Sequence, residues 1–149
     1  MGTYIGVDLG GTKIAGIVIN DRGETLSEET IPTLAEEGQE VVIERIKSVI
    51  RGLMAKTEEE PVRGIGLCAP GPLSVQTGVI IDAPNLGWKN VPIVSILEKK
   101  FGLPVVIEND ANAAAIGECY YGAGQGTTDM IYITVSTGIG GGIISRGEL

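Results

Sequence analysis

Histidine is absent from the 149 residues, and only two cysteines, one tryptophan and one phenylalanine occur. Without an imidazole to activate it, Cys68 is not expected to act as a nucleophile, and a zinc site within these residues is not expected either. Cys68 and Cys119 lie in apolar stretches and give no disulfide framework, so the cytoplasm is the expected compartment.

Basic residues and long apolar runs are also scarce. Eleven lysines and arginines stand against 19 aspartates and glutamates, a net charge of −8, which argues against a nucleic-acid partner or an anionic membrane surface. No apolar run approaches about 18 residues, so no transmembrane helix is expected. With 43% hydrophobic residues, the chain is expected to be globular, and its length predicts about one domain.

Glycine, in contrast, is abundant. There are 23 glycines, about twice the usual share of roughly 7%. Two groups, at residues 10–11 and 138–142, directly follow predicted strands. A glycine backbone at such a position can come close to a ligand.

Hydrophobic periodicity predicts an α/β domain with a mixed sheet. Apolar runs at 3–8, at 13–19 and up to Ile31, with a turn signal at 20–23, predict an antiparallel three-stranded meander. Apolar residues recur at helical spacing within 36–56; they are Val42, Ile46, Val49, Ile50 and Leu53. The other predicted elements are a strand at 62–68, a loop-rich stretch at 69–89, a helix at 91–101, a strand at 105–107, a helix from 109 to 121, and strands at 129–135 and 138–145.

A faint internal repeat relates the two ends of the chain. Residues 4–10 (YIGVDLG) and 132–138 (YITVSTG) share four identities in seven. Each is a predicted strand followed by a glycine turn and a second glycine-bearing strand. A duplication would place the start of a second unit near residue 128.

The first motif that can carry chemistry is DLGGTK at residues 8–13. Asp8 ends a strand, where its carboxylate can hold a metal ion or the waters around it. Gly10 and Gly11 let backbone N–H groups approach a phosphate, and Thr12 and Lys13 can add a hydroxyl and a positive charge. The alternative is a simple hairpin whose glycines supply positive φ angles, with Asp8 in solvent.

The second motif, TGIGGG at residues 137–142, has four glycines in five positions after a strand. So many glycines cost chain entropy, and close approach to a ligand explains them better than a simple turn does. The motif is therefore a second candidate for phosphate contact. Two such turns suggest a nucleotide held between two units.

The third motif is ENDAN at residues 108–112. Asn109 or Asp110 can serve as the N-cap of the following helix. One cap is sufficient, however, and a carboxylate at a strand-to-helix junction is well placed to act as a general base. Ala111 and the alanines at 113–115 would let another backbone pack closely. Both interpretations stay open on these residues alone.

Five segments, in this order and spacing, resemble the ROK family of sugar kinases, notably bacterial glucokinases. They are DLGGTK (8–13), APGP (69–72), APNLGW (83–88), ENDAN (108–112) and STGIGGG (136–142). The resemblance covers essentially the whole chain. It implies the ribonuclease-H-like, actin-type ATPase fold, in which two duplicated α/β lobes bind ATP, Mg²⁺ and the sugar in a cleft.

The resemblance also implies roles for individual residues. Asp110 would be the general base that accepts the proton of the sugar 6-hydroxyl, as that oxygen attacks the γ-phosphate of ATP. The implied sugar-binding residues are Gly71, Asn85, Asn109 and Asp110. The implied phosphate-binding residues are Asp8, Gly10, Gly11, Thr12 and Lys13 in the first turn, and Thr137 and Gly138 in the second.

Further expectations follow from the family pattern. Residues 1–122 would form the first lobe, and residues 123–149 a linker and the opening hairpin of a truncated second lobe. A Glu-x-Gly-His sugar contact and a cysteine-rich zinc motif of the family do not occur in this sequence. Catalysis by this chain alone is therefore expected to be weak, and the hairpin at 129–146 is expected to pair with another copy or to limit solubility.

The expected partners are a small-molecule sugar and ATP, with neither nucleic acid nor membrane, and a homo-oligomer is expected. The expected reaction is the ATP-dependent phosphorylation of a hexose, with glucose favoured. N-acylhexosamine kinases, fructose kinases and non-catalytic sugar-binding regulators of the family share the same core motifs. They stay open as alternatives.

Overall fold

The computed structural model describes residues 2–57, 60–135 and 138–149. It contains two compact units, Met1–Glu108 and Asn109–Leu149, and each is described by itself. The elements of the first unit are β1 (Thr3–Leu9), β2 (Lys13–Asn20), β3 (Thr25–Pro32), the 3-10 turn η1 (Ala35–Glu37), α1 (Gln39–Met54), β4 (Val62–Ala69), β5 (Leu73–Ser74), β6 (Val79–Ala83), the 3-10 turn η2 (Pro84–Leu86), β7 (Trp88–Val91), α2 (Ile93–Phe101) and β8 (Val105–Asn109), whose last residue opens the second unit.

The main sheet has five strands in the order β3-β2-β1-β4-β8. β1, β2 and β3 form an antiparallel meander, and β4 runs parallel to β1. The predicted meander and the predicted mixed sheet are therefore confirmed. Strand alternation places Ile5, Val7 and Leu9 of β1 toward the core, and Tyr4 and Asp8 on the opposite face.

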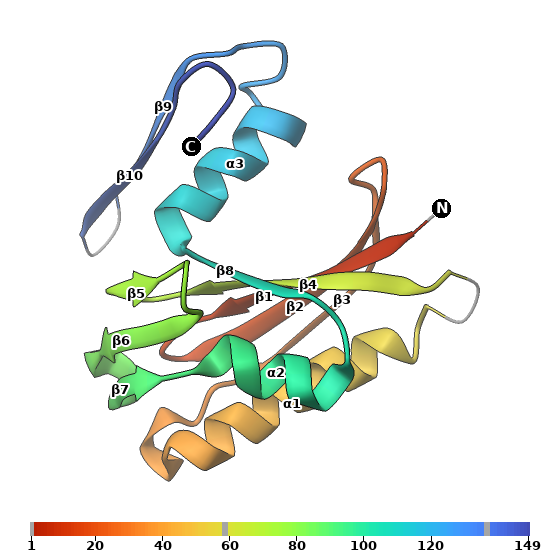
Figure 1. The fold of residues 1–149 in the computed structure, drawn as a ribbon, viewed down its shortest axis with the longest axis vertical. Helices are drawn as coiled ribbons and strands as arrows, with labels where there is room; N and C mark the ends of the chain where they lie inside the picture. The colour runs from red at the N-terminus through yellow and green to blue at the C-terminus, as the bar shows by residue number, and fades with distance from the viewer. Residues whose placement is uncertain (1, 58–59, 136–137) are drawn as a thin grey trace. The chain divides into compact units, whose positions relative to one another are not determined.

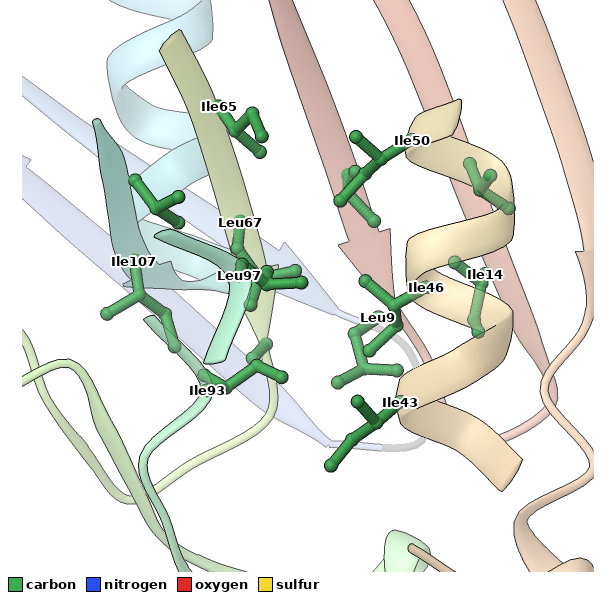
Figure 2. Close-up of a cluster of buried hydrophobic side chains, with 14 of the residues drawn as sticks. Leu9, Ile14, Ile43, Ile46, Ile50, Ile65, Leu67, Ile93, Leu97 and Ile107 are labelled. Atoms are coloured by element: carbon green, nitrogen blue, oxygen red, sulfur yellow. The ribbon is translucent and has the colours of Figure 1, made fainter. Parts of the chain in front are cut away.

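The helices α1 and α2 lie on one face of this sheet (Figure 1). The apolar residues predicted to share one side of α1 are all fully buried; they are Val42, Ile46, Val49, Ile50 and Leu53. Figure 2 shows Ile46 and Ile50 of α1 directed toward the sheet, and Ile93 and Leu97 of α2 grouped with Leu67 and Ile107. Burial of this apolar layer gives the first unit a continuous core.

The stretch predicted as loop-rich contains a second, three-stranded sheet, β5-β6-β7. Its strands have only two, five and four residues, too few for periodicity to reveal them. The sheet is held by its own buried side chains, which join the core of the first unit; they are Ile80, Ala83, Trp88 and Val91.

The second unit consists of α3 (Asp110–Tyr121) and a hairpin of β9 (Met130–Val135) and β10 (Ile139–Ile144). One face of the hairpin packs on α3, and the other carries exposed apolar side chains, including Ile131, Ile133 and Ile139, which are 71%, 63% and 82% exposed. An antiparallel pair of strands is present at both ends of the chain, as the internal repeat predicts. The lobe boundary at residue 122 remains a prediction. No helix in the described ranges could cross a membrane.

Candidate functional site

The first glycine turn, residues 10–13, joins β1 to β2 beyond the last strand pair, Leu9 with Ile14. The Gly10 N–H donates to the carbonyl of Lys13 at 2.9 Å. Two further hydrogen bonds come from Thr33, just after β3. Its hydroxyl donates to the Gly10 carbonyl at 2.7 Å, and its N–H donates to the Thr12 carbonyl at 2.9 Å. The turn is therefore tied to both of the strands that follow it.

Close approach, and not backbone conformation, explains the two glycines of this turn. Neither Gly10 nor Gly11 has a φ angle in the left-handed region, so the alternative of glycines that supply positive φ is wrong. A Cβ atom at Gly10 would lie 2.9 Å from the carbonyl oxygen of Lys13, and one at Gly11 would lie 3.3 Å from the Cβ of Asn85. The turn thus passes directly beside the segment that contains Asn85.

Asp8 and Lys13 stand on the same face of the sheet, the face opposite α1. Partial burial of the carboxyl raises the pKa of Asp8 above its ordinary value of 3.8, and the Lys13 ammonium opposes that rise. Solvent still reaches the Asp8 side chain, which screens both effects. The strand neighbours of Asp8 are the small residues Ala15 and Cys68, so the carboxylate has room to meet a ligand.

The segment around Asn85 is a short, well-anchored loop. Asn85 is exposed in the middle of η2, while Leu86 and Trp88 beside it are almost fully buried. Gly87 ends η2 in the left-handed region with a φ of 64°, and its N–H donates to the Pro84 carbonyl at 3.1 Å. The buried side chains hold this loop in place and leave the Asn85 amide at the surface.

Gly71 lies two residues before β5 of the small sheet. β5 pairs with β6 through Leu73 with Ile80 and Ser74 with Val79. The peptide bond between Gly71 and Pro72 is cis. The Pro72 carbonyl accepts hydrogen bonds from the N–H groups of Ile81 and Asp82, at 2.9 and 3.2 Å. The structure thus brings the predicted sugar-binding Asn85 beside the predicted phosphate-binding Gly11, whereas the atoms nearest to a Cβ atom at Gly71 would belong to Leu73.

The third motif joins β8 to α3. The Oδ1 of Asn109 accepts a hydrogen bond from the N–H of Asn112 at 3.0 Å, so Asn109 is the N-cap. Asp110 is the first residue of α3, and its side chain is exposed. Because Asn109 already performs the capping, this role does not account for Asp110. A carboxylate in the first turn of a helix is favoured by the helix dipole.

The second glycine segment, residues 138–142, has a different origin. Thr137 lies outside the described residues. Gly138 has open space around the position of a Cβ atom. Cβ atoms at Gly140 and Gly142 would lie 3.2 and 2.6 Å from the Cβ atoms of Ala111 and Ala115. The close packing predicted for the alanines of α3 is therefore confirmed, and it explains these two glycines without a ligand.

Sequence reasoning did not single out Thr33 or Trp88. Thr33 is fully buried and holds the first glycine turn, and Trp88, three residues after Asn85, is fully buried. The register of β2 and β3, once known, points to Thr33. Pairing of Lys13 with Pro32 across β2 and β3 places Thr33 next to Thr12.

The sequence profile of the ROK family matches residues 4–149. The chain is 43% identical over 149 residues to a glucokinase of Streptomyces coelicolor, covering 100% of this chain and 45% of that protein. It is 38% identical to a xylose repressor of Caldicellulosiruptor bescii, covering 100% and 38%, and 35% identical to an N-acetylmannosamine kinase of Escherichia fergusonii, covering 99% and 49%. The chain thus spans less than half the length of each of these relatives.

Two solved structures are similar over nearly the whole chain. A glucokinase from Streptomyces griseus in complex with glucose and AMPPNP has a TM-score of 0.88 and 42% identity, covering 99% of this chain and 46% of that one. A ROK hexokinase from Thermus thermophilus has a TM-score of 0.88 and 44% identity, covering 98% and 48%. These similarities confirm the predicted actin-type ATPase fold.

Proposed function

The chain belongs to the ROK family, and on that premise we propose that it serves the ATP-dependent phosphorylation of a hexose, with glucose favoured. The observation that carries the proposal is the contact between the first glycine turn and the Asn85 loop. A Cβ atom placed at Gly11 would lie 3.3 Å from the Cβ of Asn85, so a phosphate at the turn and a sugar at Asn85 would be neighbours. Phosphoryl transfer depends mainly on such alignment and on charge stabilisation.

On this proposal the first glycine turn binds the phosphates of ATP. The backbone N–H groups of its central residues, Gly11 and Thr12, donate to phosphate oxygens, the Thr12 hydroxyl adds a donor, and the Lys13 ammonium adds positive charge. The proposed phosphate-binding residues are Asp8, Gly10, Gly11, Thr12, Lys13, Thr137 and Gly138. These local donors matter because the chain as a whole carries a net charge of −8 and repels anions at long range.

The proposed sugar-binding residues are Gly71, Asn85, Asn109 and Asp110. Asp110 acts as the general base. Its carboxylate accepts the proton of the sugar 6-hydroxyl while that oxygen bonds to the γ-phosphorus, the bond from the γ-phosphorus to the bridging oxygen breaks, and ADP departs. A carboxylate at the start of a helix suits this role because the scaffold fixes its position.

The residues present also suit Mg²⁺. Within the described ranges, no three His, Cys, Asp or Glu side chains gather as a metal cage. Magnesium in kinase sites is commonly bound by one or two carboxylates together with the substrate phosphates, and the exposed carboxylate of Asp8 beside the first glycine turn offers such a ligand. Bound there, the ion would neutralise charge on the transferring phosphoryl group.

The proposed function is tested by measuring ADP release from Mg-ATP in the presence and absence of glucose. We expect glucose-dependent release, lowered about 10²- to 10⁴-fold by Asp110→Asn, because removal of a general base costs about that much. The matched control is Asp21→Asn, which alters an exposed aspartate in the turn after β2 and should leave turnover unchanged. Equal turnover by Asp110→Asn and the unchanged protein would contradict the assigned role.

The alternatives rest on the other relatives. Similarity to an N-acetylmannosamine kinase and to a xylose repressor supports an N-acylhexosamine kinase or a sugar-binding regulator as the second candidate. Parallel titrations with glucose, N-acetylmannosamine, fructose and xylose distinguish them: a regulator binds its sugar without releasing ADP, and a kinase of another sugar releases ADP with that sugar. A homo-oligomer, also proposed, can be measured by sedimentation.

A further inference from the structure

We propose that Thr33 is a positioning residue that holds the first glycine turn in the shape needed to meet the phosphates of the nucleotide. The inference deepens the proposed function and rests on it. Thr33 itself is fully buried and is not expected to touch a ligand. It acts through the backbone of residues 10–13.

Thr33 holds this turn at two points. Its hydroxyl donates to the Gly10 carbonyl at 2.7 Å, and its N–H donates to the Thr12 carbonyl at 2.9 Å. The two carbonyls belong to the peptide groups on either side of the central residues of the turn. A single buried residue thus fixes the orientation of both peptide planes.

The orientation of those planes determines where the turn can donate hydrogen bonds. In a planar trans peptide, the carbonyl and the following N–H point in opposite directions. Because the Gly10 carbonyl points toward Thr33, the Gly11 N–H of the same peptide group points away from Thr33. The Thr12 carbonyl also points toward Thr33, so the Lys13 N–H points away from Thr33 as well. The Thr33 hydroxyl therefore keeps the Gly10 carbonyl, which would repel an anion, turned inward.

The surroundings of Thr33 are themselves held firmly. The carbonyl of Pro32 accepts a hydrogen bond from the Nε of Arg45 in α1, at 2.6 Å. Leu34 on the other side adopts a left-handed conformation, with φ of 56°, which a leucine keeps only when its neighbours impose it. The next residues form η1, which contacts η2 around Asn85. Thr33 therefore lies on the segment that links α1, the first glycine turn and the Asn85 loop.

Two substitutions separate the role of the Thr33 hydroxyl from that of the side-chain shape. Thr33→Val keeps the shape and removes the donor, whereas Thr33→Ser keeps the donor. The matched control is Thr3→Val, at the other end of the meander. Thr3 is also fully buried, and its hydroxyl donates to the Glu60 carbonyl at 3.4 Å. A loss of stability common to buried threonines will appear in Thr33→Val and Thr3→Val alike.

The experiment measures the dissociation constant of Mg-ADP by calorimetry and the backbone order parameters of residues 10–13 by NMR. For Thr33→Val we expect the dissociation constant to rise at least tenfold, and the order parameters of the turn to fall from about 0.85 toward 0.6. Thr33→Ser should stay within about twofold of the unchanged protein, and Thr3→Val should change neither readout. Unaltered order parameters in Thr33→Val would overturn the inference.

Two measurements separate this inference from the proposed function. Absence of Mg-ADP binding by the unchanged protein would contradict the proposed function, while the order parameters would still test the role of Thr33. If Thr33→Val does not fold, the test is the rate at which the Thr33 hydroxyl proton of the unchanged protein exchanges with water, measured by NMR. A proton protected from exchange with water supports the hydrogen bond to Gly10. One that exchanges as fast as the hydroxyl of an exposed threonine overturns it.

Discussion

The two glycine-rich segments look alike in sequence, yet the structure gives their glycines different reasons. The first turn needs a glycine at position 11 because the Asn85 loop passes beside it: a Cβ atom at Gly11 would lie 3.3 Å from the Cβ of Asn85. The second segment needs a glycine at position 142 because α3 packs on β10: a Cβ atom at Gly142 would lie only 2.6 Å from the Cβ of Ala115. A glycine run after a strand therefore indicates close approach, but it does not say whether the neighbour is a loop, a helix or a ligand.

The surroundings of the two hairpins differ in the same way. β1 and β2 lie inside a five-stranded sheet with α1 packed on its inner face. β9 and β10 form a two-stranded sheet whose outer face exposes Ile131, Ile133 and Ile139. An isolated two-stranded hairpin is marginal in water, so the packing of α3 on its inner face is the main source of its stability. The second hairpin should accordingly be the more sensitive of the two to loss of packing.

The largest expected effect is on the second unit. Gly142→Ala places a methyl group against Ala115 and within 3.1 Å of the Ala111 carbonyl, and such overpacking costs about 1–3 kcal/mol. Hydrogen exchange of the α3 and β10 amides measures this loss locally. Gly117→Ala is the matched control: the same substitution meets nothing within 4 Å on α3, and it should stabilise the helix by about 0.5–1 kcal/mol. Equal protection in the two variants would remove packing as the reason for Gly142.

A smaller effect on stability, with a larger one on ligand binding, is expected at the first turn. Gly11→Ala pushes the turn and the Asn85 loop apart by a few tenths of an ångström, and it should weaken Mg-ADP binding about tenfold, or about 1.4 kcal/mol. Calorimetry measures the change.

Gly66→Ala provides the control for the first turn. It adds a methyl group on β4 that comes no closer than 4.0 Å to Val106 and should leave binding unchanged. If Gly11→Ala binds as the unchanged protein does, the contact with Asn85 has no part in nucleotide binding. The comparison between the two glycine segments would then reduce to two cases of packing.

Local patterns were sufficient to predict most of the fold. The meander and α1 follow from runs long enough to show period 2 and period 3.6, and every apolar residue predicted for the inner side of α1 is buried. The strands β5 to β7 were missed because strands of two to five residues, broken by proline and glycine, carry too little periodicity. Their stability comes from contacts such as the burial of Trp88, which are long-range in sequence.

In the candidate site, too, local features could be predicted from the sequence and long-range contacts could not. The sequence indicates that Gly10 and Gly11 permit a close approach, but not that the neighbour is Asn85, more than 70 positions later. The hydrogen bond from Thr33 to Gly10 spans 23 positions and leaves no local mark. It can be inferred only once the register of β2 and β3 is known. Predicted roles for Asp110 and Thr137 rest on family resemblance and remain predictions.

The smallest expected effects concern pH and have opposite signs in the two units. Burial raises the pKa of Asp8 in the folded state, so the folded state binds a proton more readily than the unfolded chain. Stability therefore falls as pH rises from the ordinary value of 3.8 through the raised pKa. Asp8→Asn removes this loss and should raise the unfolding midpoint at pH 7 relative to the unchanged protein, although it removes a proposed ligand-binding group.

Asp129 provides the opposite case. Its carboxylate accepts hydrogen bonds from the Arg146 N–H and the Ser145 hydroxyl, at 3.1 Å each, and from the Thr128 hydroxyl at 3.0 Å. These bonds lower the pKa of Asp129. Its contribution to stability is therefore present above pH 3.8 and lost as pH falls through the lowered pKa. Asp129→Asn should lower the midpoint at pH 7. Urea unfolding at pH 4 and pH 7 checks both signs, and a midpoint shift of the same sign in the two variants would contradict the assigned causes.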